Sequence, residues 1–237
     1  EMVIRDWSSD VCSSDLPILN WLLIGVNTLV FLFELSLSPQ ALEQFISFFG
    51  IVPQQLSLTR PWALLSDPLP LISLLTHMFL HGGWIHFLSN MWILFIFGDN
   101  VEARMGHTRY LVFYIVGGVI AGLVQALIAP NSSIPSIGAS GAIAAVLGAY
   151  LVLFPHSRVV TLVPIFFFFW FIDIPAIFYL GFWFISQLFS GLMSLPTAGA
   201  VGGVAWWAHI GGFVYGVVLH RFFVQKQPRE YTLQNYQ

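Results

Sequence analysis

Charged residues are what this 237-residue chain has least of. Asp, Glu, Lys and Arg make up 8% of it, whereas hydrophobic residues make up 57%, and the mean hydropathy is +0.82. Soluble domains carry about 25% charged residues. A chain of this size cannot bury so much apolar surface within itself, so lipid must be its solvent. The composition therefore excludes a soluble globular domain and predicts an integral, multi-pass membrane protein.

Cysteine is nearly absent as well. The single cysteine, Cys12, excludes a disulfide framework within the chain and offers no cysteine metal cluster. The interval between His81 and His86 is not the HExxH spacing of a zinc site. The net charge of −3 and the lack of a basic stripe argue against a nucleic-acid partner. We therefore expect no metal, no other cofactor and no nucleic acid.

The first stretch, EMVIRDWSSDVCSSDL, differs from everything after it. It is polar, rich in Asp and Ser, and has no apolar period and no signal-peptide pattern. It resembles the translated remnant of a sequencing adaptor, in which case the native N-terminus is missing; the alternative is a short disordered tail. We expect residues 1–16 to be non-native or disordered and assign them no function.

From Leu16 onward the chain is a series of apolar runs near the ~20 residues that a membrane-spanning helix needs. We predict an all-α membrane protein, a bundle of six transmembrane helices over residues 17–224, followed by a cytoplasmic tail at 225–237. The six helices are expected at about 18–36, 72–97, 109–129, 138–154, 174–193 and 200–223.

The limits of the fifth helix are ambiguous. Residues 159–193 hold one charge, Asp173, and the run is too long for one straight span and too short for two. Pro164 and Pro175 interrupt it. We place the helix at 174–193 with Asp173 in or just before its first turn, where a carboxylate suits the helix dipole. The preceding TLVPIFFFFWF is expected to lie along the membrane interface.

Basic residues in the loops predict the orientation. With six spans both termini share one side, and only Arg60, in the long first loop, falls on the other side. Such an asymmetry indicates that the termini are cytoplasmic. The basic residues on the terminal side are Arg104, Arg109, Arg158, Arg221, Lys226 and Arg229.

Polar residues inside membrane spans are costly and usually functional. The second, fourth and sixth expected helices run in the same direction, and each carries such residues in its outer half: His86 and Asn90, then Ser140, then His209. All four can lie at one depth, about 10–15 Å below the outer surface at 1.5 Å per residue. His86 and Asn90 are four apart and share a helical face, whereas His81 should point elsewhere.

Serine hydrolase chemistry fits these residue types. A serine hydroxyl is a weak nucleophile unless a base takes its proton, and a neutral His209 can be that base for Ser140. Small residues, Gly141 among them, let the fourth and sixth helices approach and bring the pair together. His86, the Asn90 amide and the Ser140 backbone N–H could bind the oxyanion. No intramembrane carboxylate stands out, so the sequence predicts a dyad.

Three segments carry a family resemblance. HGGWIHFLSN, GASG and AHIGGFVYG, in this order and on spans of matching direction, resemble the rhomboid intramembrane serine proteases over about residues 18–224. The resemblance implies that Ser140 is the nucleophile and His209 the base, that His86 and Asn90 help to bind the oxyanion, and that His81 supports the local structure. Gly138 and Gly141 flank the serine, and Gly138 allows close backbone approach to it.

Two further segments match the same family. VEARMG, with Glu102, Arg104 and Gly106, matches the cytoplasmic end of its second helix, where we expect structural pairing. The first loop, 37–71, resembles its membrane-lying loop, although here Pro61 separates Arg60 from Trp62, and some members have an adjacent Trp-Arg pair.

Three function classes compete. The first is an intramembrane serine endopeptidase that cuts single-pass transmembrane protein substrates, which enter from the lipid bilayer between the second and fifth helices, the fifth being a mobile gate. The second is a catalytically inactive rhomboid-like protein that binds transmembrane segments. A transporter would need inverted repeats and a central charged site, which the sequence lacks. We favour the protease and expect a bacterial cytoplasmic membrane.

Overall fold

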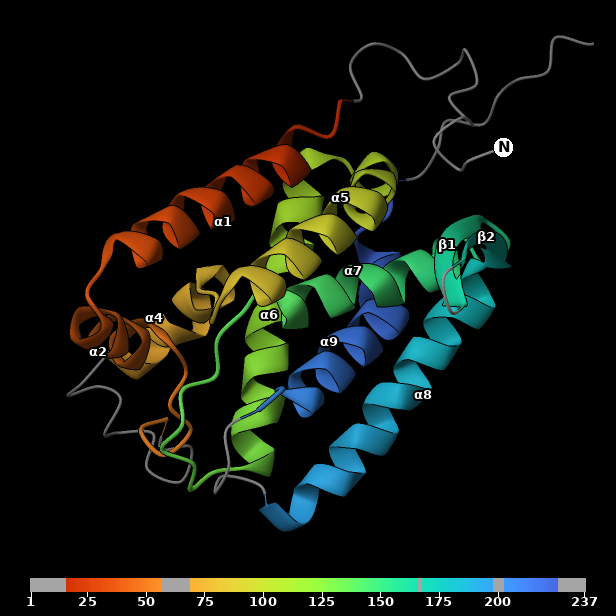
Figure 1. Cartoon of the computed structure of the whole chain (residues 1–237). Helices are drawn as coiled ribbons and strands as arrows, with labels where there is room; N and C mark the ends of the chain where they lie inside the picture. Colours follow the sequence, from red (N-terminus) through yellow and green to blue (C-terminus); the bar gives the residue numbers. More distant parts are fainter. Residues whose placement is uncertain (1–15, 57–68, 166–167, 198–202, 226–237) are drawn as a thin grey trace, which may run out of the picture.

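The structure is a computed structural model that describes residues 16–56, 69–165, 168–197 and 203–225. It is mostly helical, and Figure 1 shows the helices packed around one another in a single bundle. The elements, in chain order, are α1 (Ile18–Ser36), α2 (Pro39–Phe49), α4 (Leu69–Thr76), η2 (His77–Phe79), α5 (Trp84–Met105), α6 (His107–Ile128), α7 (Ser140–Leu153), β1 (Arg158–Ile165), β2 (Phe168–Pro175), α8 (Ala176–Ser194), η3 (Leu195–Thr197), α9 (Trp206–Leu219) and η4 (His220–Phe222).

Helix α7 forms the centre of the bundle. Every residue from Gly141 to Tyr150 is buried, and α5, α6, α8 and α9 all pack against it (Figure 1). Glycines make the closest of these contacts possible. A Cβ on Gly148 would collide with the backbone of α9, and a Cβ on Gly212 or Gly216 would collide with the backbone of α7. Helices α7 and α9 therefore touch backbone to backbone, as small residues allow in membrane bundles.

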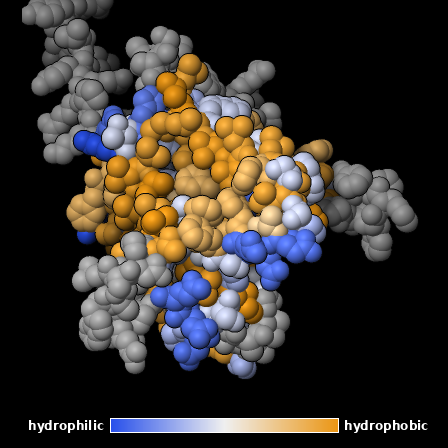
Figure 2. Space-filling view, turned by 90° about the vertical axis from the view of Figure 1, so that its left-hand side faces the viewer, coloured by the Kyte–Doolittle hydropathy of each residue, from blue (hydrophilic) through white to orange (hydrophobic). Residues whose placement is uncertain are grey.

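The outside of the bundle is apolar. Large hydrophobic side chains on α1 and α8 are more than half exposed, for example Leu29, Phe178 and Phe182. Figure 2 shows a broad hydrophobic area on one face, with hydrophilic side chains at its borders. Exposed apolar surface on this scale indicates a protein that lies in lipid.

The length of the helices tests the six expected spans. Three helices, α1, α6 and α8, are long and apolar enough to cross a membrane, and a fourth span arises if the bent pair of α4 with η2 and α5 is taken together. Helices α7 and α9 have 14 residues each, about 21 Å at 1.5 Å per residue, which is shorter than a bilayer core of about 30 Å. The structure thus supports a membrane bundle, and by length it provides three or four of the six predicted spans.

The second expected span, 72–97, has wrong limits. The apolar run divides into α4 with η2 and then α5, and the two pieces are bent by 78° at the break. The break contains Gly83, whose φ of +145° is a conformation that other residues rarely adopt. As a result α5 starts only at Trp84 and continues to Met105, while His77 and His81 precede it.

The stretch before the fifth helix is a β-hairpin, so the all-α prediction is wrong there. Strands β1 and β2 pair antiparallel, from Arg158 opposite Pro175 to Ile165 opposite Phe168. Asp173 lies in β2 opposite Val160, outside the first turn of α8. The hairpin satisfies the backbone of this Pro-interrupted run, which could not continue as a helix.

The two ends of the described chain lie at the same end of the bundle. Glu102, near the end of α5, accepts hydrogen bonds from the backbone N–H groups of Leu19 (3.0 Å) and Asn20 (2.7 Å) at the start of α1. The N–H of Gln225 donates to the carbonyl of Arg104 at 3.0 Å. The pairing expected in VEARMG therefore joins Glu102 to α1, and Glu102 also contacts His107. Residues 1–15, Arg60 with Trp62, and the tail from 226 lie outside the described ranges.

Candidate active site

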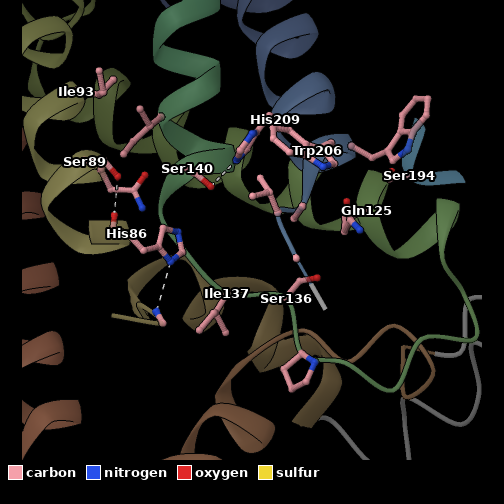
Figure 3. A pocket seen from close by; sticks show the side chains of 18 of the residues that line it. His86, Ser89, Ile93, Gln125, Ser136, Ile137, Ser140, Ser194, Trp206 and His209 are labelled. Atoms are coloured by element: carbon pink, nitrogen blue, oxygen red, sulfur yellow. Dashed lines mark hydrogen bonds between the residues drawn. The ribbon is translucent and has the colours of Figure 1, made fainter. Parts of the chain in front are cut away.

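Ser140 and His209 face each other across the contact between α7 and α9. Ser140 is the first residue of α7, and its Oγ lies 2.8 Å from Nε2 of His209, in the first turn of α9 (Figure 3). The two residues are 69 apart in the sequence, so the close packing of the two helices brings them together. Both side chains are partly buried. The structure therefore joins the two residues that the sequence predicted as a pair.

The loop before α7 is held in the shape that presents Ser140. Gly138 has a φ of +124°, which favours glycine. Its N–H donates to the backbone carbonyl of His77 at 2.9 Å. The N-cap residue, Ala139, provides no side-chain cap, so the first N–H groups of α7 have no capping side chain and add the positive end of the helix dipole at the serine.

His86 lies on the other side of Gly138. A Cβ on Gly138 would stand 2.6 Å from Nε2 of His86 and 3.7 Å from Oγ of Ser140, so the ring and the hydroxyl flank the same small residue. The other ring nitrogen, Nδ1, lies 3.4 Å from the N–H of Gly82. Because that N–H can only donate, Nδ1 accepts and Nε2 carries the proton. His86 thus presents a donor toward Ser140, as Figure 3 allows the reader to follow.

Asn90, one turn after His86 on α5, is buried and lines the same cavity. Its amide nitrogen, Nδ2, has no hydrogen-bond partner among the described residues. A buried amide donor without a partner costs free energy. A donor of this kind in the cavity that Ser140 also lines is available for an oxygen atom that arrives with a ligand.

The supporting residues act at a distance from the hydroxyl. His81 is buried, its backbone N–H donates to the Glu34 carboxylate at 3.1 Å and 3.2 Å, and its ring packs against Phe31 and His86. It braces His86 and does not reach Ser140. Gly141 lies where a Cβ would meet Ala121 of α6 at 2.6 Å, so its small size sets the packing of α7.

One residue of the site, Gln187, was not predicted from the sequence. Gln187, on α8, is 6% exposed, and its Oε1 lies 2.8 Å from Nδ1 of His209. A signal for it was present, because an amide inside an expected membrane span belongs to the costly polar groups that mark function. The predicted dyad rested on the lack of an intramembrane carboxylate, and Gln187 carries an amide instead.

A cavity of about 1110 Å³ opens beside these residues. The loops before α7 and α9 line it, and Ser140, His209 and His86 border it (Figure 3). Asn90 is also among its lining residues. It continues between α5 and α8 along Ile93 and Trp183 as far as Phe97 and Tyr179. The rings of Phe97 and Tyr179 stack with centroids 6.4 Å apart. The cavity is thus a groove that connects Ser140 with the space between two outer helices.

The arrangement suits nucleophilic chemistry at Ser140. An imidazole nitrogen within hydrogen-bond distance can take the hydroxyl proton, and His86 and Asn90 line the same cavity as Ser140. In the part of the chain that the structure describes, no group of three His, Cys, Asp or Glu side chains could hold a metal ion.

Comparisons with known proteins identify the family of the chain. The rhomboid domain model matches residues 69–226. A presenilin-associated rhomboid-like protein A, mitochondrial, of Danio rerio is 30% identical over 59% of this chain and 34% of its own length. RHOMBOID-like protein 6, mitochondrial, of Arabidopsis thaliana is 33% identical over 66% of this chain and 44% of its own. The mouse presenilin-associated rhomboid-like protein, mitochondrial, is 26% identical over 82% and 46%.

These relatives are longer than the chain. The chain spans less than half of the length of each. Their names place them in mitochondria, so the expectation of a bacterial membrane has no support. The names describe rhomboid-like proteins and state no catalytic activity.

Proposed function

Because the chain belongs to the rhomboid family, we propose that it is an intramembrane serine endopeptidase that hydrolyses peptide bonds in or near transmembrane helices of single-pass membrane proteins. The observation that carries the proposal is the distance of 2.8 Å between Oγ of Ser140 and Nε2 of His209. In the proposed reaction His209 takes the hydroxyl proton while Oγ attacks the peptide carbonyl, and His209 then returns the proton to the leaving amine.

The oxyanion that forms in this attack needs donors. Nε2–H of His86, the unpartnered Nδ2 of Asn90 and the Ser140 backbone N–H at the start of α7 are the proposed donors. Preorganised donors of this kind stabilise the tetrahedral intermediate because charge develops where they already point. Water from the outer side would then hydrolyse the acyl-enzyme, since hydrolysis needs water and the centre of a bilayer has none.

We further propose six membrane passes, made by α1, α5, α6, α7, α8 and α9, with both termini cytoplasmic. The shared location of Leu19, Arg104 and Gln225 at one end of the bundle supports an even number of passes. Arg104 and Arg109 lie at that same end, where Nη1 of Arg109 is 3.4 Å from the Val224 carbonyl, and basic residues favour the cytoplasmic side. The short α7 then starts below the outer surface, at the open cavity.

The groove between α5 and α8 is the proposed entry for the substrate. It is lined by Ser140 and by Tyr179 and Trp183 of α8, and this helix exposes apolar side chains elsewhere along its length, such as Phe178 and Phe189. A substrate helix would unwind on entering, because a helical peptide bond is shielded by its own hydrogen bonds. Helix α8 would act as the gate.

The second candidate function uses the groove for binding alone, without hydrolysis. A rhomboid-like protein that binds transmembrane segments without cutting them agrees with the comparisons at least as well, because the relatives' names state no protease activity. We favour the protease because Ser140 and His209 are both present and hydrogen-bonded.

The test is cleavage of a type I transmembrane reporter in liposomes by the wild type and by Ser140→Ala. Product with the wild type alone is expected, since a serine hydrolase without its nucleophile loses several orders of magnitude in rate. Equal cleavage by both would exclude Ser140 as the nucleophile. If neither cleaves and a fluorophosphonate does not label Ser140, the non-catalytic binding protein becomes the better description.

A further inference from the structure

We propose that Gln187 is the positioning residue of His209: it holds the imidazole in the tautomer that accepts the Ser140 proton, and it does so from α8. The inference rests on the proposed protease function and deepens it. The site is then a Ser-His-Gln relay in which the third member is a neutral amide. The sequence had predicted a dyad because it offered no intramembrane carboxylate.

The burial of Gln187 singles it out on α8. The buried residues of this helix are Ala176, Leu180, Gln187 and Gly191, which face the bundle, whereas the flanking Ile185 and Phe189 are 64% and 65% exposed. A buried amide in a membrane helix is retained only when its hydrogen bonds are made. Gln187 meets this condition, because both ends of its amide have partners within the described residues.

The hydrogen bonds fix the direction of the amide. Nε2 of Gln187 lies 3.0 Å from Oγ of Ser186 and 3.3 Å from the carbonyl oxygen of Trp183. The Ser186 hydroxyl donates to the same Trp183 carbonyl at 2.6 Å, so its oxygen is free to accept. A flipped amide would set its oxygen against that carbonyl, with no hydrogen between them. The amide nitrogen therefore belongs on this side, and Oε1 faces His209.

The tautomer of His209 follows from the amide. Oε1 of Gln187 is only an acceptor, so Nδ1 of His209, at 2.8 Å, carries the proton. Nε2 is then the unprotonated nitrogen, and it faces Oγ of Ser140 at 2.8 Å. Only this tautomer can act as the base, because the other would point an N–H at the hydroxyl. A serine protease whose third member no longer orients the base loses rate for the same reason.

The amide also acts during the proton transfer. As the bond from Oγ of Ser140 to the substrate carbon forms, the π bond of the substrate carbonyl breaks and its electron pair moves onto the oxygen, while the hydroxyl proton moves to Nε2 and the ring becomes an imidazolium. Its Nδ1–H then donates to Oε1 of Gln187 as a charged donor, and such hydrogen bonds are stronger than neutral ones. The rings of Trp183 and Trp206 pack about 6 Å from the imidazole and restrict its rotation, so that the amide has one ring orientation to stabilise.

The location of Gln187 links the base to the proposed gate. Ser140 and His209 belong to α7 and α9, which touch backbone to backbone, whereas Gln187 belongs to a helix that faces lipid along much of its length. When α8 lies against α9, the relay is complete. When α8 moves away, His209 loses the partner that fixes its tautomer while Ser140 stays in place.

The experiment compares Gln187→Met, which keeps the size and removes the acceptor, with Gln187→Glu, which keeps an acceptor oxygen. Phe182→Leu, on the same helix at a position 76% exposed, is the matched control. Kinetics of reporter cleavage in liposomes give kcat and KM, and thermal unfolding reports the fold. We expect Gln187→Met to lower kcat about 10- to 100-fold, the range for losing a hydrogen bond to a charged group, with KM and Tm little changed. Gln187→Glu should recover most of the rate, and Phe182→Leu should match the wild type.

A second measurement keeps the inference separate from the protease proposal. Nitrogen–proton spectra of isotope-labelled histidine, with His209 identified by its loss in His209→Gln, show which ring nitrogen carries the proton. The expected result is a proton on Nδ1 in the wild type and a mixture of tautomers in Gln187→Met. Normal kcat in Gln187→Met, or an unchanged tautomer, overturns the role of Gln187 even where the wild type cleaves. If the wild type does not cleave, the protease proposal fails and the tautomer alone decides the inference.

Discussion

Gly138→Ala is the sharpest test of the oxyanion donors, because the structure predicts two separate costs for one methyl group. The φ of Gly138 is +124°, and holding a non-glycine residue in such a conformation costs about 1–3 kcal/mol. The new Cβ would also stand 2.6 Å and 2.7 Å from Nε2 and Cε1 of His86. That ring would have to move away from Ser140.

The second cost should appear in the rate of the chemical step. If the displaced His86 no longer donates to the oxyanion, the loss is that of one donor, about 2.7–4 kcal/mol or 10²–10³ in kcat. The assay is reporter cleavage under saturating substrate, with Tm measured in parallel. We expect a lower Tm and a much lower kcat from this single methyl group.

Gly83→Ala is the matched control for the backbone strain. Gly83 also has a positive φ, +145°, yet a Cβ there would meet nothing within 4 Å. It should lower Tm by a similar amount and leave kcat near the wild-type value. If Gly138→Ala lowers Tm as Gly83→Ala does and also leaves kcat unchanged, then His86 is not an oxyanion donor and the reasoning is wrong.

Two further predictions concern Asn90 and the contact between α7 and α9. Asn90→Ala removes the unpartnered donor Nδ2 and should lower kcat by at most about 10²–10³ with KM unchanged; an unchanged rate would remove Asn90 from the proposed donors. Gly216→Ala should destabilise by about 1–3 kcal/mol through overpacking, because its Cβ collides with the α7 backbone, whereas Gly181→Ala, with open space around its Cβ, should be neutral or slightly stabilising. Thermal unfolding of Gly216→Ala and Gly181→Ala tests the second prediction. Equal Tm values for these two variants would contradict the close contact of α7 and α9.

The sequence predicted the parts of the site that depend on helix direction and spacing. Ser140 and His209 meet because the fourth and sixth apolar runs are parallel and rich in small residues, and both properties can be read from composition and order. Four residues separate His86 from Asn90, which is a helical period. The helix direction and the residue spacing do not depend on the loop conformations, because both follow from the geometry of a helix in lipid.

Hydropathy could not predict where an apolar run breaks. The run around His77 and His81 is as apolar as a continuous helix, but the chain bends by 78° within it because Gly83 allows a backbone conformation that hydropathy does not describe. The Phe-rich run before α8 likewise became a hairpin, because hydrogen bonding between Arg158–Ile165 and Phe168–Pro175 is a property of two segments together. Gln187 was missed for a different reason: its role depends on the orientation of an amide.

The position of Gln187 on α8 divides the site into two parts. Ser140 and His209 lie on helices that are packed backbone to backbone, whereas Gln187 lies on a helix that is proposed to move. A serine and its base must stay within hydrogen-bond distance at every turnover, and the backbone contacts that Gly148, Gly212 and Gly216 allow between α7 and α9 provide that constancy. A substrate that arrives through lipid requires an opening in the wall of the bundle, which α8 can provide because its outer face contacts no other helix among those described. Under the two proposals Gln187 orients His209 from the gate helix α8, so closure over a substrate and preparation of the base would be one event. Under the proposed function, a site built this way would attack a peptide bond only after α8 has returned to α9.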